Sequence, residues 1–155
     1  GALTIGTLDG ANVEICEQVG AENFFLFGKT AEEISSLHNE GYRPWELIGS
    51  MPELAEILRL VEQGHFSNGD GDLFRPLLQN LTGRDPFFVL ADFNDYLRAQ
   101  AEVDRTWADR GRWNRMSLLN SARSGFFSSD RSIREYAERI WKAESFPVTI
   151  TCELD

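Results

Sequence analysis

Two short apolar segments before residue 29 constrain the fold of this chain most strongly. Residues 2–8, Ala-Leu-Thr-Ile-Gly-Thr-Leu, are apolar and β-branched, a pattern that predicts a strand buried on both faces. The second segment, residues 23–28, follows after the length of one helix. Together they predict a β-α-β unit with parallel strands. Because two strands alone do not make a stable parallel sheet in water, this unit requires packing neighbours.

Helical periodicity dominates the chain after residue 29. Thr30 with Glu33, and Ser50 with Glu53, have the spacing of a capping box at a helix start, and Gly64 is placed to end the helix that follows Ser50. Further helices are predicted from Asp72, from Asp92, from about Gly111 to Gly125, and from Asp130. Apolar residues recur at helical spacing in these segments: Leu54, Ile57, Leu58 and Val61; Leu73, Leu77, Leu78 and Leu81; Phe93, Tyr96, Leu97 and Val103; Trp113, Met116 and Leu119; Ile133, Tyr136, Ala137, Ile140 and Trp141.

This order of elements indicates an α/β fold, with two N-terminal strands followed mainly by helices. The chain has 155 residues, of which 42% are apolar and 12% aromatic, enough for one packed core. It contains no internal repeat and no low-complexity linker. We expect residues 1–145 to form the terminal portion of a doubly wound, Rossmann-like domain whose earlier strands are missing. Residues 146–155, with Pro147 and a short β-branched run at 148–151, are expected to be a tail.

The charge and the cysteines limit the partners and the compartment. The formal net charge is -10, from 25 acids and 15 bases, which disfavours nucleic acid as a partner. The longest apolar run covers residues 87–91, far below the roughly 20 residues of a membrane span, and no secretion signal is recognisable. Cys16 and Cys152 have no metal or redox spacing, so we expect a reducing, cytoplasmic setting.

The turn between the first strand and the first helix is the most informative candidate site. Residues 6–14, Gly-Thr-Leu-Asp-Gly-Ala-Asn-Val-Glu, lead a strand through a glycine loop into a helix N-terminus. Such a turn can bind an anion through free backbone N–H groups. It can equally be a structural turn in which Asp9 or Asn12 caps the helix. The spacing matches neither a Walker A loop nor a dinucleotide fingerprint, so both interpretations stay open.

Three other candidate motifs lack a required residue at the required spacing: a calcium loop, a histidine site and a nucleophile elbow. Residues 67–72 alternate oxygen-bearing side chains, yet Leu73 and Gln79 stand where a calcium loop needs glycine and glutamate, which favours a solvated turn ending at Asp72. His38 and His65 have no paired acids or cysteines nearby, so neither a zinc site nor a Cys/His nucleophile is indicated. Ser124 lacks the glycine pattern of a nucleophile elbow.

Basic and aromatic residues offer two weaker candidates. The basic residues could bind phosphate or an acidic partner, but interleaved acids favour a helix face with solvated ion pairs; they are Arg110, Arg112, Arg115 and Arg123. The tryptophans Trp45, Trp107, Trp113 and Trp141 could stack on sugar rings. Trp113 and Trp141 fall on apolar stripes and are expected in the core. These residues form no complete catalytic constellation.

Three motifs resemble segments of one known family, the glycogen (maltodextrin, starch) phosphorylases. Residues 1–14, Gly-Ala-Leu-Thr-Ile-Gly-Thr-Leu-Asp-Gly-Ala-Asn-Val-Glu, resemble the family's segment just after its cofactor lysine, and residues 22–28, Glu-Asn-Phe-Phe-Leu-Phe-Gly, resemble the following strand. Residues 124–133, Ser-Gly-Phe-Phe-Ser-Ser-Asp-Arg-Ser-Ile, with Tyr136 and the pair at 140–141, resemble its closing helix. With shorter matches between them, the likeness extends over about 140 residues in the same order.

The resemblance implies the C-terminal, cofactor-side portion of a two-domain glycosyltransferase with its active site between the domains. Such enzymes transfer a glucosyl unit from the non-reducing end of an α-1,4-glucan to phosphate, giving glucose 1-phosphate. They hold pyridoxal phosphate on a lysine. That lysine matches a position upstream of Gly1, as do the sugar-binding and phosphate-binding residues. Lys29 and Lys142 are the only lysines here, and neither has that context.

The resemblance therefore assigns no catalytic, cofactor-binding or metal-binding residue to this chain. Residues 6–14 are expected only to back the cofactor segment, and the chain alone is expected to be inactive and without bound cofactor. Its expected partners are the missing domain and sheet strands, with a homo-oligomer through the open sheet edge as a further possibility. An alternative is a non-catalytic interaction or oligomerisation module built from the same fold. Because Gly1 begins inside the strand pattern with no methionine, we expect a fragment of the enzyme.

Overall fold

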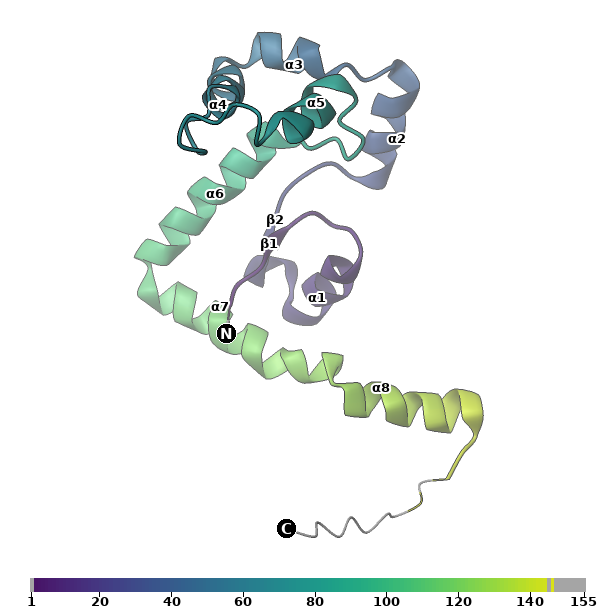
Figure 1. The fold of residues 1–155 in the computed structure, drawn as a ribbon. Coiled ribbons are helices and arrows are strands. Elements are labelled where there is room, and N and C mark those ends of the chain that lie inside the picture. The colour runs from purple at the N-terminus through teal and green to yellow at the C-terminus, as the bar shows by residue number, and fades with distance from the viewer. Residues whose placement is uncertain (1, 145, 147–155) are drawn as a thin grey trace, which may run out of the picture.

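A computed structural model describes residues 2–144 and residue 146, and it is mainly helical with one small sheet (Figure 1). Of the expected tail at 146–155, residues 147–155, including Cys152, lie outside the described residues. The described strands and α-helices are β1 (Ile5–Gly6), α1 (Ala11–Val19), β2 (Phe25–Leu26), α2 (Ala31–Glu40), α3 (Pro44–Ser50), α4 (Pro52–Glu62), α5 (Arg75–Gly83), α6 (Phe93–Ala108), α7 (Arg110–Arg123) and α8 (Ser129–Glu135). Short 3-10 turns cover Ala21–Asn23 and Ser124–Phe127, and a π-helical segment, Tyr136–Trp141, extends α8.

The predicted β-α-β unit is confirmed. β1 and β2 pair in parallel, with Ile5 opposite Phe25 and Gly6 opposite Leu26, and α1 connects them. Each strand has only two residues, fewer than the sequence pattern indicates. Within the described part of the chain each strand has one neighbour, so few backbone groups can join the ladder. Leu8, two residues after β1, is 50% exposed.

The core of this unit lies between α1 and β2. Cys16, Val19 and Phe24 form the buried cluster, and α7 passes beneath it (Figure 1). The Asn120 side-chain amide of α7 donates to the Asn23 carbonyl at 3.1 Å. The Arg123 guanidinium donates to the Val19 carbonyl at 2.7 Å, at the C-terminus of α1. A cation at this end of a helix satisfies carbonyls that the helix leaves free. Helix α7 therefore holds the N-terminal unit in place.

Two predicted helix ends are confirmed. The Thr30 hydroxyl accepts from the Glu33 backbone N–H at 3.3 Å, and the Glu33 carboxylate accepts from the Thr30 N–H at 2.8 Å, completing the capping box. Gly64 has φ +72° and its N–H donates to the Val61 carbonyl. Because the next N–H, of His65, donates to Leu60, this is a Schellman motif, for which glycine is favoured.

The other predicted helix starts need correction. Ser50 is the last residue of α3, and its hydroxyl donates to the Leu47 carbonyl at 2.9 Å, so the second capping box is wrong. Pro52, which fits a first helical position, starts α4 instead. Asp72 lies three residues before Arg75, the first residue of α5, and pairs with it. Asp130 lies inside α8, and α7 starts one residue before Gly111 and ends before Gly125.

A buried carboxylate joins α2 to the loop before α6. Asp85 is 1% exposed and accepts from the Tyr42 hydroxyl at 2.7 Å and from the backbone N–H groups of Val89 and Leu90. These three donors satisfy the buried carboxylate. Burial and then the Asp85 hydrogen bond raise the pKa of the Tyr42 hydroxyl, so it stays protonated and continues to donate. This contact fixes the loop at 85–92 that approaches the sheet.

We expect Tyr42→Phe to lower the free energy of unfolding by about 2 kcal/mol, because it removes one donor from a buried carboxylate. Thr106→Val is the matched control. The Thr106 hydroxyl is buried and has no hydrogen-bond partner in the described structure, so its removal should leave stability unchanged or raise it. Urea unfolding followed by circular dichroism measures both. Equal destabilisation by the two variants would contradict the role given to Tyr42.

Candidate functional site

The carboxyl ends of β1 and β2 form the candidate functional site. Thr7 and Asp9 follow β1, and Phe27 and Gly28 follow β2. Ligands of open α/β sheets bind outside the carboxyl ends of the strands. The N-terminal half of α6 and the loop before it lie beside these ends, because Asp92 and Asp95 hydrogen-bond to the chain just after β2.

Helix α6 holds the end of β2 through three long-range hydrogen bonds. The Asp92 carboxylate accepts from the Lys29 N–H at 2.9 Å, and the Asp95 carboxylate accepts from the Gly28 N–H at 2.7 Å. The Arg98 guanidinium donates to the Leu26 carbonyl at 2.9 Å and pairs with Asp95 at 2.6 Å. Asp92 was predicted to start a helix, and it does precede α6, but its side chain satisfies the strand end rather than its own helix.

The carboxylates of Asp92, just before α6, and Asp95, in its first turn, have pKa values shifted in opposite directions. The hydrogen bond from the Arg98 guanidinium lowers the pKa of Asp95, with a smaller contribution from the Gly28 N–H. Burial raises the pKa of Asp92, although the Lys29 N–H acts in the opposite direction. A desolvated carboxylate in a concave region is a frequent feature of binding sites. Asp92 is therefore the more informative of the two for ligand binding.

A cavity of about 630 Å³ opens at the strand ends. Its walls come from four separate parts of the chain and are mostly apolar and aromatic. Phe27 and Tyr96 meet edge to face with ring centroids 5.3 Å apart, and Phe87 is 82% exposed at the cavity. The cavity is lined by Thr7, Asp9, Phe27, Ile57, Phe87, Val89, Asp92, Phe93 and Tyr96. Its volume and composition match those of small-molecule sites.

The turn at residues 6–14 contributes Thr7 and Asp9 to this cavity. Neither Asp9 nor Asn12 caps α1, since Gly10 occupies the N-cap position without a side-chain bond. The Asn12 amide instead donates to the Thr7 carbonyl at 3.0 Å, and the Thr7 hydroxyl donates to Asp9 at 3.1 Å. The lining residues include carboxylates and no cation. An anion is therefore disfavoured at this turn.

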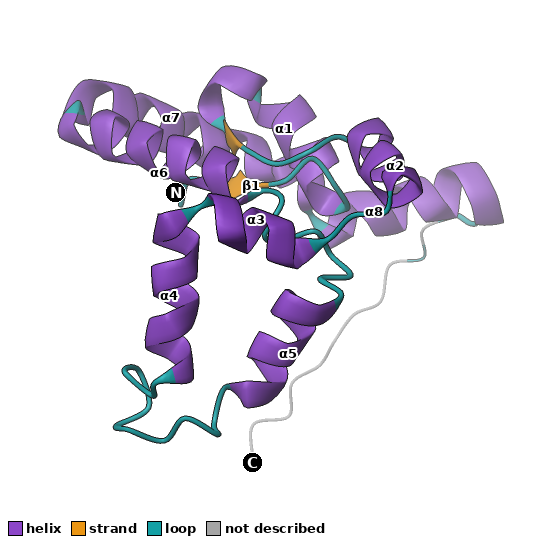
Figure 2. Ribbon diagram, turned by 90° about the horizontal axis from the view of Figure 1, so that it is seen from above, coloured by secondary structure: helices purple, strands orange, loops and turns teal. Residues whose placement is uncertain are grey.

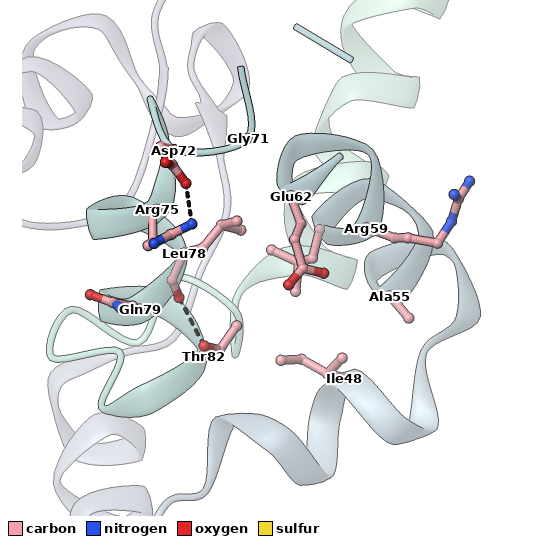
Figure 3. A pocket seen from close by; sticks show the side chains of 11 residues that line it. Ile48, Ala55, Arg59, Glu62, Gly71, Asp72, Arg75, Leu78, Gln79 and Thr82 are labelled. Carbon is pink, nitrogen blue, oxygen red and sulfur yellow. Dashed lines mark hydrogen bonds and ion pairs between the residues drawn. The ribbon is translucent and has the colours of Figure 1, made fainter. Parts of the chain in front are cut away.

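A second cavity, of about 740 Å³, lies between α4 and α5, which diverge from α3 (Figure 2). Figure 3 shows Asp72 paired with Arg75 and the Thr82 hydroxyl bonded to the Leu78 carbonyl. Arg59, also on its wall, pairs with Glu56. These polar groups are satisfied by partners three or four residues away in the sequence rather than converging on a ligand. The site at the strand ends is the better candidate for this reason.

The remaining sequence candidates do not come together. His38 and His65 are exposed, and no group of three metal-ligating side chains occurs in residues 2–144. Trp141 is 61% exposed, so its expected core position is wrong, whereas Trp113 is half-buried and contacts Phe25 and Trp107. Among the basic residues, Arg112 pairs with Glu102 at 3.3 Å, as the solvated-face interpretation predicts.

The sequence of this mainly helical chain with its parallel β-α-β start matches a known family over most of its length. Residues 1–143 match the family model for carbohydrate phosphorylases. The chain belongs to this family.

Individual relatives agree with this assignment. Glycogen phosphorylase of Synechocystis sp. is 54% identical over 153 residues, 99% of this chain and 18% of the relative. Glycogen phosphorylase of Chlamydia pneumoniae is 46% identical, over 91% of this chain and 17% of the relative. The muscle form of glycogen phosphorylase from Homo sapiens is 44% identical, over 93% of this chain and 17% of the relative. The chain thus spans less than a fifth of these relatives' length.

The helices of the described residues are also too short or too polar to span a membrane.

Gly28→Ala should destabilise the protein by more than about 1 kcal/mol. Gly28 has φ +91°, and an added Cβ would lie 2.7 Å from the Thr7 methyl and 2.8 Å from an Asp92 oxygen. Gly49→Ala in α3 is the control, because an added Cβ there meets nothing within 4 Å and alanine favours a helix. Thermal unfolding distinguishes the two, and a Gly28 variant as stable as the Gly49 variant would refute the close approach.

Asp95→Asn should lower stability near neutral pH by up to about 1 kcal/mol, since the pair with Arg98 is partly exposed and screened. A lowered carboxyl pKa stabilises the folded state above the unfolded pKa, and this contribution is lost as the pH falls through the folded pKa. The difference from the parent should therefore persist from neutral pH down to about pH 4, and it should shrink as the pH falls further through the lowered pKa of the folded state.

Asp92→Asn is the control for this pH dependence. The pKa of the Asp92 carboxyl is raised by burial, so folding does not favour its charged form. We therefore expect that Asp92→Asn does not lower the free energy of unfolding at neutral pH through loss of charge. The amide oxygen can still accept from Lys29. Urea unfolding at several pH values measures both variants, and a pH-independent deficit for Asp95→Asn would contradict the ion-pair explanation.

Proposed function

We propose that this chain is the C-terminal part of an α-1,4-glucan phosphorylase that transfers a glucosyl unit from the non-reducing end of a glucan to phosphate. The family match over residues 1–143 carries this proposal. Relatives named glycogen phosphorylase, aligned over nearly the whole chain, support it. The product would be glucose 1-phosphate, and the complete enzyme would act in the cytoplasm.

In this proposal residues 1–145 are the incomplete end of a doubly wound, cofactor-side domain, and residues 146–155 are a tail. The parallel pairing of β1 and β2 supports a place at one side of a larger parallel sheet. The open edge of this pair would receive a strand from the rest of the polypeptide, or from a second copy in the isolated chain. The partners of the enzyme would be the glucan and phosphate.

The described residues do not fit the pyridoxal phosphate of such an enzyme. Lys29 lines a cavity of about 520 Å³ in which the one arginine, Arg98, already pairs with Asp95, so no cation is available for the cofactor phosphate. Lys142 is exposed at the end of the last helical segment. We therefore assign the cofactor to the longer protein, assign no catalytic, cofactor or metal residue here, and expect the isolated chain to be inactive.

The role of this chain in the enzyme would be to support the segment that carries the cofactor. Gly6 is buried, and a Cβ there would lie 2.6 Å from the Asn12 amide nitrogen. The strand, the turn and the start of α1 are therefore closely packed, with no room for a side chain at position 6. A rigid support of this kind fixes the groups that lie in front of it.

Glucose 1-phosphate formation tests the proposal directly. The assay supplies maltoheptaose, phosphate and pyridoxal phosphate to the 155-residue chain and to the product of the same gene extended upstream. We expect activity in the extended protein alone. Activity in the 155-residue chain would refute its dependence on upstream residues. Inactivity of both would favour the non-catalytic module, and the oligomeric state of the chain would then be the next measurement.

A further inference from the structure

We propose that the groove between α4 and α5 binds a basic amphipathic helix of another protein. This groove is the cavity of about 740 Å³ between the two helices, to which α3 contributes Ile48. It shares no lining residue with the cavity at the strand ends. The inference concerns a protein partner, so it does not depend on the proposed function.

The walls of the groove are one face of each of two helices. Lining residues of α4 occur at positions 55, 58, 59 and 62, and those of α5 at positions 75, 78, 79 and 82. This is the i, i+3, i+4, i+7 spacing of a single helix face over two turns. Helix α3 contacts both helices, which diverge from it (Figure 2). Since α4 has 11 residues and α5 has 9, the groove can receive about two turns of a third helix.

The apolar side chains of the groove are only partly covered by the described residues. Helix α5 has leucines at helical spacing but no buried residue, and its groove residue Leu78 is half-buried. Helix α4 buries Leu54 alone, and its groove residue Leu58 is also half-buried. The apolar face of a partner helix would remove these side chains from water, which is the usual basis of helix-in-groove binding.

The charge of the groove favours a basic partner. Figure 3 shows the Glu62 carboxylate directed into the groove and the Arg59 guanidinium directed away from it. Both arginines that line the groove pair with nearby carboxylates, whereas Glu62 has no hydrogen bond or ion pair within the described part of the chain. Residues 44–83 contain six acids and two arginines, a net charge of -4. Lysine or arginine beside the apolar face of the partner would complement this charge.

A second copy of this chain fits the groove less well. Its formal net charge of -10 makes two copies repel each other. Helix α7 has four arginines and no acid, but it packs on its own N-terminal unit, where Trp113 contacts Phe25 and Arg123 donates to Val19. The basic helix is therefore expected from a different protein.

A designed peptide of about 18 residues tests the apolar part of this inference. The peptide carries leucines on one helix face and lysine and alanine elsewhere, and fluorescence anisotropy measures its binding to the 155-residue chain. We expect saturable binding, weakened at least about fivefold by Leu78→Ala, because less apolar surface is then buried. Leu77→Ala is the matched control: Leu77 is 52% exposed on the same helix but does not line the groove, so binding should be unchanged.

Two further measurements test the role of charge. A peptide with glutamate in place of lysine should bind at least about fivefold more weakly. Glu62→Gln should weaken binding of the lysine peptide by about threefold at low salt and by less at high salt, since the ion pair is screened. Glu53→Gln, an exposed position of α4 outside the groove, is the control. Circular dichroism establishes that each variant is folded.

Four results would overturn the inference. The first two are no saturable binding of the lysine peptide to the folded chain, and equal affinity in Leu78→Ala and Leu77→Ala. The third is a chain that sediments as a dimer and becomes monomeric in Leu78→Ala, which would make a second copy the occupant. The fourth is an upstream-extended protein that does not bind the peptide, which would assign the groove to internal packing of the longer polypeptide.

Discussion

The N-terminal unit depends on the hydrogen bonds that the carboxylates of Asp92 and Asp95, at the start of α6, accept from the chain just after β2. A two-residue parallel pair has too few ladder bonds to hold itself together in water. Asp92 and Asp95 supply acceptors for the N–H groups of Lys29 and Gly28, and Arg98 supplies a donor for Leu26. The helix thus completes the hydrogen bonding that a further strand would otherwise provide.

The same contact explains the shape of the candidate site. To bring its carboxylates to the strand end, α6 must approach so closely that position 28 has no room for a Cβ. The loop before α6 is fixed in turn by the buried Asp85 and its bond from Tyr42. Phe87 and Val89 follow Asp85 directly, so their places beside the strand ends are set by this anchor. The positions of Asp85, Asp92 and Asp95 therefore determine both the hydrogen bonds that hold the strand end and the shape of the cavity beside it.

The local elements could be predicted from the sequence, whereas these long-range contacts could not. Alternation and spacing within a few residues determine a strand, an amphipathic helix or the capping box at Thr30, and these predictions are confirmed. Asp92 and Asp95 read locally as helix-start acids. Their partners lie 63 and 67 residues away, and no pattern in one sequence connects the two. Asp85 was missed because nothing nearby marks a buried carboxylate, except that it begins a loop rich in aromatic residues.

Amphipathic spacing predicts a helix, but it does not predict whether the apolar face of that helix is buried. The stripe that contains Ile133, Ile140 and Trp141 does form a helix, but all three side chains are largely exposed, because no other segment of residues 2–144 covers that face. Trp113 lies on a comparable stripe and is half-buried, since β2 supplies Phe25 as a neighbour. Periodicity thus shows which face of a helix can be buried. Whether it is buried depends on a second surface, and that surface is a property of the tertiary structure.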